Sequence, residues 1–143
     1  MIAYSGTLMG LDYGHRRIGV AVGQTVTGTA TALEVVPQRS GAPDWARLEA
    51  LRAQWRPQAW VLGWPRPADG TQTPLLQAVA RFSAELEQRS GLPVESIDER
   101  LSSHAARELA AGRGRGGPGI DAIAAQLILE SWFSHVRQPP SAT

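Results

Sequence analysis

The chain begins with short apolar segments whose spacing predicts strands. Residues Thr7–Tyr13 form a nearly continuous apolar run, and in Arg17–Gly23 the apolar residues alternate with small ones. The turn residues Gly14 and His15 separate these two segments, so we expect a hairpin. The next segment, Gly28–Val36, is rich in Thr and Val and is expected to add a third antiparallel strand.

After the third strand, helical spacing of apolar residues alternates with short apolar runs. Two further strands are expected, at Ala59–Gly63 and Pro93–Ile97. Helices are expected at Pro43–Trp55, from the N-cap Thr73 to the stop signal Gly91, from Ser102 to about Ala111, and at Ile120–Val136. Pro43 suits the first turn of its helix. This order is typical of a mixed α/β sheet flanked by helices, because an antiparallel start does not fit a purely parallel sheet.

Length and composition favour a single domain of 143 residues, of which 43% are hydrophobic. We expect its core at about residues 7–136, a flexible glycine-rich loop at about 112–119 and a polar tail at 138–143. No apolar run approaches the length of a membrane span, and Met1–Gly10 lacks a signal-peptide pattern, so we expect a cytoplasmic protein with no membrane partner. The absence of cysteine excludes disulfides and thiolate zinc sites.

The overall charge does not reveal a partner. The formal net charge is +1, and all fourteen basic residues are arginines. Arginine suits bidentate contacts with phosphate. The same usage also follows from a codon bias toward GC, which the abundant Ala and Gly share, so charge alone favours neither interpretation.

Three acidic residues lie at the ends of separate predicted elements. Asp12 ends the first strand, Asp98 or Glu99 follows a later strand, and Asp121 lies in the first turn of the last helix, on a face that continues with apolar residues. Each also has a simpler interpretation. Asp12 could be a turn residue, the acid after the later strand could form an exposed ion pair with Arg100, and Asp121 could be a favourable charge at a helix N-terminus. If the three converge, their repulsion requires cations, and one or two Mg²⁺ or Mn²⁺ ions suit an all-oxygen site. Two such ions could hydrolyse a phosphodiester.

Other candidate residues carry weaker signals. The three histidines lack the spacing of zinc ligands and suit surface or cap positions. Arg113 and Arg115 lie in the glycine-rich loop, where they could bind phosphates or belong to a solvated linker. Trp64 could stack on a base, although a packing role is the simpler interpretation.

Four sequence blocks together resemble the YqgF/RuvX-like family. The blocks are Leu11–Gly23, Val61–Pro65 with Asp69–Thr71, Asp98–Ser102, and Ile120–Ala125. Their order and spacing match from about Thr7 to Phe133, nearly the whole chain. The resemblance implies a ribonuclease-H-like fold and a bacterial cytoplasmic nuclease that processes the 5′ end of pre-16S rRNA. A Holliday junction resolvase acting on four-way DNA is the alternative within the same class.

The resemblance also assigns site residues by position. Asp12, Glu99 and Asp121 match the family's catalytic acids and would hold one or two Mg²⁺ or Mn²⁺ ions, with Asp98 as a second-choice ligand. The positions implied to contact phosphate are Arg17 and Arg100, with Arg113 and Arg115 as substitutes for a basic residue that relatives carry just before the helix acid.

The sequence departs from the family pattern in three places. Trp64 stands where relatives often have Leu, and Pro118-Gly119 stand where they often have Lys or Arg. No second acid follows one turn after Asp121. This last departure weakens the expectation of two tightly bound metal ions.

The implied partner is a nucleic acid, first a structured rRNA precursor and with it ribosomal particles, bound by a monomer or weak homodimer. A rival interpretation is a non-catalytic RNA-binding or ribosome-assembly module, which the near-neutral charge and the single helix acid favour. An actin-like phosphate-binding domain is a more distant alternative, because only one such half fits in 143 residues.

Overall fold

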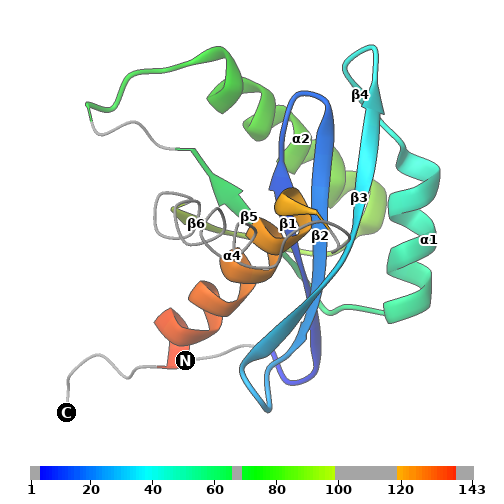
Figure 1. Cartoon of the computed structure of the whole chain (residues 1–143), viewed down its shortest axis with the longest axis vertical. Helices are drawn as coiled ribbons and strands as arrows, with labels where there is room; N and C mark the ends of the chain where they lie inside the picture. The colour runs from blue at the N-terminus through cyan, green and yellow to red at the C-terminus, as the bar shows by residue number, and fades with distance from the viewer. Residues whose placement is uncertain (1–3, 66–68, 99–118, 138–143) are drawn as a thin grey trace.

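The computed structural model describes residues 4–65, 69–98 and 119–137. Within these residues, six strands form one sheet in the order β4-β3-β2-β1-β5-β6 (Figure 1). The strands are β1 (Thr7–Tyr13), β2 (Arg17–Gln24), β3 (Thr29–Arg39), β4 (Ala42–Pro43), β5 (Trp60–Trp64) and β6 (Val94–Asp98). The helices are α1 (Trp45–Trp55), α2 (Pro74–Ser90) and α4 (Ile120–Arg137).

The directions of the strands confirm the mixed sheet expected from the sequence. Strands β1, β2 and β3 are antiparallel neighbours, as the hairpin pattern predicts. Strand β5 runs parallel to β1, and β6 runs parallel to β5. The carboxyl ends of β1, β5 and β6 therefore meet at one edge of the sheet, where open α/β folds commonly bind ligands.

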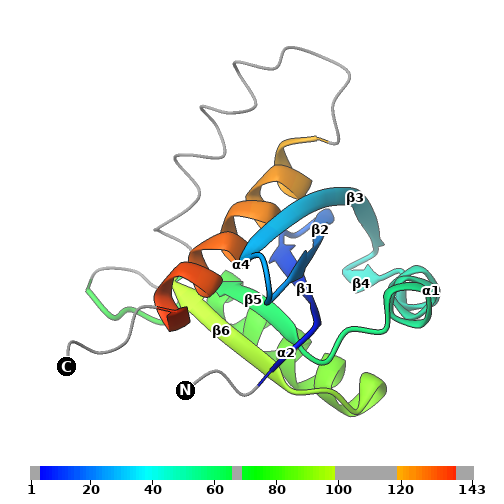
Figure 2. The ribbon, with the colours of Figure 1, turned by 90° about the horizontal axis from the view of Figure 1, so that it is seen from below.

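The helices cover the two faces of the sheet unequally. Figure 2 shows α4 on one face and α1 with α2 on the other. The core is correspondingly divided into two main clusters of buried residues. One fills the space under α1 and α2 and includes Met9, Leu11 and Phe82; the other lies under α4 and includes Leu8 and Phe133. Alternate residues of β1 thus contribute to opposite clusters, as the two-residue period of a strand requires.

Helix α4 packs against the sheet over a line of glycines. A Cβ atom added to Gly19 would lie 1.8 Å from the backbone oxygen of Asp121, and one added to Gly10 would lie 2.8 Å from that of Ala125. A Cβ atom on Gly23 would lie 2.8 Å from the ring of Phe133. These three positions have no room for a side chain, so the sequence of β1 and β2 sets how closely α4 approaches.

Capping residues define the ends of the two helices on the other face. Asp44 caps α1 by accepting a hydrogen bond from the backbone N–H of Arg47. Thr73 caps α2, and Gly91 ends it in the left-handed region at φ 72°, as expected. The expectation that Pro43 lies in the first turn of this helix is wrong. Pro43 belongs to β4, where it pairs with Gln38 of β3, and it precedes the cap of α1.

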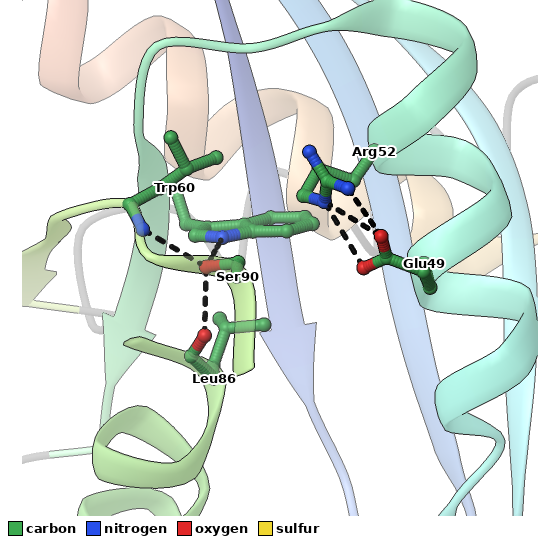
Figure 3. A network of polar contacts seen from close by, with 6 residues as sticks. Glu49, Arg52, Trp60, Leu86 and Ser90 are labelled. Carbon is green, nitrogen blue, oxygen red and sulfur yellow. Dashed lines mark hydrogen bonds and ion pairs between the residues drawn. The ribbon is translucent and has the colours of Figure 1, made fainter. Parts of the chain in front are cut away.

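Trp60 is a central residue of the core between α1 and α2. Its ring is 1% exposed, and its indole N–H donates to the hydroxyl of Ser90 at 3.0 Å (Figure 3). Ser90 in turn donates to the carbonyl of Leu86, and it accepts from the N–H of Leu92. This network satisfies the polar atom of a buried tryptophan and fixes the end of α2 against β5.

Some expected features lie outside the described residues. They are the helix from Ser102 to about Ala111, most of the glycine-rich loop, and the polar tail at 138–143. Among the helices in the described part of the chain, none is long and apolar enough to cross a membrane.

Candidate active site

Asp12 lies near the carboxyl end of β1, on the face of the sheet that α4 covers. Its neighbour Leu11 belongs to the cluster under α1 and α2. Gly10, two residues earlier, lies directly under Ala125 of α4. Because side chains alternate along a strand, Asp12 shares the face of Gly10. The side chain of Asp12 is half-buried and has polar interactions.

Asp121 reaches the same place from the other end of the chain. It lies in the first turn of α4, where the helix dipole favours a negative charge. Its backbone lies over Gly19, since a Cβ atom added to Gly19 would lie 1.8 Å from the backbone oxygen of Asp121. Gly19 is in turn the cross-strand partner of Asp12. The structure therefore brings Asp12 and the backbone of Asp121 together on one face of the sheet. The face of α4 beyond Asp121 is apolar and buried, as the sequence predicts.

Arg17 forms an ion pair with Asp121. Its Nε donates to Oδ2 of the carboxylate at 2.9 Å, across 104 residues of sequence. The side chain of Arg17 is 62% exposed and that of Asp121 is 27% exposed, so the pair lies at the rim of the site and not in the core. Arg17 is two residues from Gly19 on β2 and shares its face.

Asp98 lies on the other face of the sheet. It is the last residue of β6 and is in register with Trp64 of β5. Neighbouring strands place in-register residues on the same face, and Trp64 packs against the cluster under α1 and α2. Asp98 therefore does not share a face with Asp12, which disfavours it as a ligand in the same site.

The donor chemistry of Asp12 and Asp121 suits a hard divalent cation. Both are carboxylates, and oxygen atoms are the ligands that Mg²⁺ and Mn²⁺ prefer. The described residues contain no group of three or more His, Cys, Asp or Glu side chains that could hold a metal ion. Glu99, the third acid expected there, follows Asp98 in the sequence and lies outside the described residues, as do Arg100, Arg113 and Arg115.

Arg39 is a cation on this face that sequence reasoning missed. It is exposed, ends β3, and has no ion pair with another described residue. Pro37 is the cross-strand partner of Arg17, so Arg39 is a diagonal neighbour on the same face, about 7–8 Å away by strand geometry. The expected strand ended at Val36 because Pro37 is a breaker. In the structure Val36 and Gln38 are buried, so the alternation continues past Pro37, but the polar Gln38 gives no sign of this in the sequence.

A cavity between α1 and α2 lies away from these acids. It measures about 260 Å³ and is lined in part by Trp45, Trp60 and Leu86. Arg89 lies over the ring of Trp45, 4.4 Å from its centroid. Since α1 and α2 cover the face opposite α4, this cavity has no access to Asp12 or Asp121.

Comparisons of sequence agree with the resemblance found in the four sequence blocks. A model of the RuvX family, described as "Holliday junction resolvase", matches residues 6–135. A protein of Chromohalobacter salexigens named "Putative pre-16S rRNA nuclease" is 45% identical over 131 residues, which cover 89% of this chain and 88% of that protein. A protein of the same name from Saccharophagus degradans is 41% identical and covers 96% of this chain and 98% of its own length.

Solved structures share the fold at low sequence identity. Thermus thermophilus RuvC in complex with a Holliday junction substrate matches with a TM-score of 0.61 at 21% identity, over 92% of this chain and 96% of that one. The fowlpox virus resolvase in complex with junction DNA matches with a TM-score of 0.59 at 11% identity, over 92% and 99% of the two chains. The fold is therefore the ribonuclease-H-like fold expected from the sequence.

Proposed function

Because the chain belongs to the RuvX family, we propose that it is a metal-dependent endonuclease that processes the 5′ end of pre-16S rRNA in the bacterial cytoplasm. The observation that carries this proposal is the meeting of Asp12 and Asp121 on one face of the sheet. Two acidic residues from opposite ends of the chain share one face at a strand end, where cations reduce their repulsion. Arg17 is one such cation, and the proposed metal ion is the other. The proposed substrate is inferred from the names of two relatives, each of which covers most of the chain.

We assign the ligands as Asp12, Asp121 and Glu99. A bound Mg²⁺ or Mn²⁺ ion supplies positive charge that activates water and stabilises the leaving oxygen of the phosphodiester. Asp12 holds its position because β1 is paired on both sides, with β2 and with β5. Asp121 holds its position because Gly19 lets α4 rest directly on β2. The backbones that carry the two carboxylates are therefore fixed by the sheet and the helix before any ligand arrives, which reduces the cost of organising the site.

Arginine side chains on the same face suit the phosphate backbone of the substrate. Arg17 and Arg39 are exposed there, and the terminal nitrogens of Arg17 make no hydrogen bond with another described residue. Arg100, Arg113 and Arg115 are further proposed phosphate contacts. No covalent intermediate with the protein is required, since the site needs only a positioned water and a stabilised leaving group.

Cleavage of four-way DNA is the second candidate. The description of the matching family favours it, and symmetric cutting of two strands would require a dimer. A third interpretation, a non-catalytic RNA-binding module, is favoured by the near-neutral charge and by the lack of a second acid one turn after Asp121. A cleavage assay separates all three.

The test compares purified wild type with Asp12→Asn on end-labelled pre-16S rRNA leader, single-stranded RNA and a four-way DNA junction, each with Mg²⁺ and with Mn²⁺. We expect specific, metal-dependent cuts in the leader, reduced to the uncatalysed background in Asp12→Asn, because the amide removes a negative charge from the cation site. The matched control is Asp44→Asn, which makes the same change at the cap of α1, where asparagine caps equally well.

Cuts confined to the junction would replace rRNA processing with junction resolution. Full activity in a folded Asp12→Asn protein would remove Asp12 from the catalytic site. RNA binding without cleavage under either metal, retained when all three acids are changed, would favour the binding module.

A further inference from the structure

The ion pair between Arg17 and Asp121 places a cation of the protein on a carboxylate that the proposed function assigns to a metal ion. The contact uses one nitrogen, Nε, at 2.9 Å from Oδ2. A guanidinium in this position neutralises the charge that would attract a divalent cation, and it occupies an oxygen that would bind it. Arg17 and a metal ion are therefore competitors for Asp121.

The competition is weak enough to be reversible. Exposed ion pairs of this kind contribute little stability, since water and salt screen them. The side chain of Arg17 is 62% exposed, so it can move away without leaving a buried cavity or an unpaired buried group. In contrast, the backbones that carry the two side chains are held closely together by the contact between Gly19 and Asp121. The guanidinium can therefore move while the carboxylate stays in place.

A substrate phosphate is the partner that would draw Arg17 away. Guanidinium binds phosphate through two nitrogens at once, whereas here it uses one nitrogen on the carboxylate. Arg39 lies diagonally across from Arg17 on the same face and attracts a phosphate backbone to this place.

We propose that Arg17 is a positioning residue that neutralises Asp121 until a substrate phosphate binds its guanidinium, so that phosphate binding and cation binding at this site promote each other. The proposal rests on the proposed function, because it takes Asp121 to be a metal ligand. It assigns Arg17 two successive partners. By linkage, whatever the phosphate adds to the affinity for the cation, the cation adds to the affinity for the phosphate.

The first experiment measures Mn²⁺ binding without RNA, by electron paramagnetic resonance of the free ion. We expect Arg17→Gln to bind Mn²⁺ about three- to tenfold more tightly than wild type, because it removes both the competitor and a nearby positive charge. Arg17→Lys keeps the charge and should remain close to wild type. The matched control is Arg89→Gln, which removes an exposed arginine from an ion pair with Glu85 on the opposite face. This variant should leave the affinity for Mn²⁺ unchanged.

A purely structural ion pair predicts a different result. In that case Arg17→Gln would lower the melting temperature and leave Mn²⁺ affinity unchanged or weaker, which would overturn the proposal. The variant Asp121→Asn separates this failure from a failure of the proposed function. If it abolishes Mn²⁺ binding while Arg17→Gln has no effect, the metal site stands and only the role of Arg17 is wrong. If Asp121→Asn leaves the affinity for Mn²⁺ unchanged, Asp121 is not a metal ligand and both proposals are wrong.

The second experiment measures binding of a short single-stranded RNA in EDTA, where no metal competes. Asp121→Asn frees Arg17 and should bind the RNA about threefold more tightly than wild type. Part of that gain comes from removing a negative charge, so the cycle includes Arg17→Gln and the double variant. We expect the gain to shrink when Arg17 is already Gln. An equal gain in both backgrounds would show that Asp121 acts alone and would overturn the proposal.

Discussion

Asp12, Gly19 and Asp121 show how single residues create the candidate site. Asp12 and Gly19 are partners in the β1–β2 ladder, so one carboxylate lies beside one position without a side chain. That position admits the backbone of Asp121. A larger residue in place of Gly19 would exclude α4 from the place where its first turn can supply the second carboxylate.

Tyr4 offers a residue-level prediction about pH. Its hydroxyl donates to Oε2 of Glu95 at 2.5 Å, and burial together with this acidic neighbour raises the pKa of Tyr4 to about 12. Protonated Tyr4 is therefore favoured in the folded protein more than in the unfolded chain, whose tyrosine pKa is about 10. The resulting stabilisation is complete below pH 10 and is lost as pH rises toward 12. Denaturant unfolding across this range should show the loss.

Two variants check this prediction. Tyr4→Phe should remove the loss of stability that wild type shows above pH 10, and Glu95→Gln should lower the pKa of Tyr4 in an ultraviolet titration. Tyr13→Phe is the control, since it leaves the pair of Tyr4 and Glu95 intact. An unchanged high-pH profile in Tyr4→Phe would contradict the assignment.

At the scale of elements, the contact between β2 and α4 determines the site. Gly19→Ala places a methyl group where the oxygen of Asp121 lies, 1.8 Å from the new Cβ. Neither backbone can yield without moving the other, so we expect a loss of about 3 kcal/mol in the free energy of unfolding. The displaced helix should also weaken Mn²⁺ binding. Denaturant unfolding and the paramagnetic resonance assay measure the two effects.

Gly91→Ala is the control for this prediction. Gly91 ends α2 at φ 72°, and a Cβ atom there meets nothing within 4 Å. Its cost is therefore backbone strain alone, about 1–2 kcal/mol, with no effect on Mn²⁺ binding. A Gly19→Ala protein as stable as wild type would mean that α4 does not rest on β2 as described.

Most elements could be predicted from local patterns, and the differences have local causes. The period of two in β2 and the caps Thr73 and Gly91 of α2 were sufficient to place those elements. The extension of β3 to Arg39 was missed because its breaker Pro37 is accommodated within the sheet. Strand β4, of two residues, has no pattern of its own, since it exists only by pairing with the end of β3.

At the scale of the whole molecule, the near-neutral charge conceals two different faces. On the face of α4, Arg17 and Arg39 lie beside the two acids; on the other face, Arg47, Arg52 and Arg89 are each paired with a glutamate. Net charge sums the two faces and so could not indicate a nucleic-acid partner. The place of Arg17 and of the exposed Arg39 beside the proposed cation site supports such a partner, because arginine suits a phosphate backbone.

The place of Arg39 on the face of α4 predicts that it matters for RNA binding. We expect Arg39→Gln to weaken RNA binding and to reduce the slope of log K against log salt by about 0.7, the value for one phosphate contact of a single strand. The matched control is Arg81→Gln, which removes an exposed arginine of α2 that has no ion pair with a described residue. Equal effects of the two substitutions would show that binding follows total charge and not the face of α4. The measurement is a salt titration of RNA affinity in the Asp12→Asn background, where cleavage is absent.

The sequence by itself determined the main strands and helices of the described residues apart from β4, the mixed sheet, and Asp12 and Asp121 as candidates, because periodicity, caps and motif spacing are local properties of the chain. It could not decide that Asp98 faces away from Asp12, since facing depends on the register between β5 and β6. It could not show that Arg17 reaches Asp121 or that Gly19 admits α4. These contacts join residues far apart in the sequence, and only the packing of α4 against the sheet brings them together.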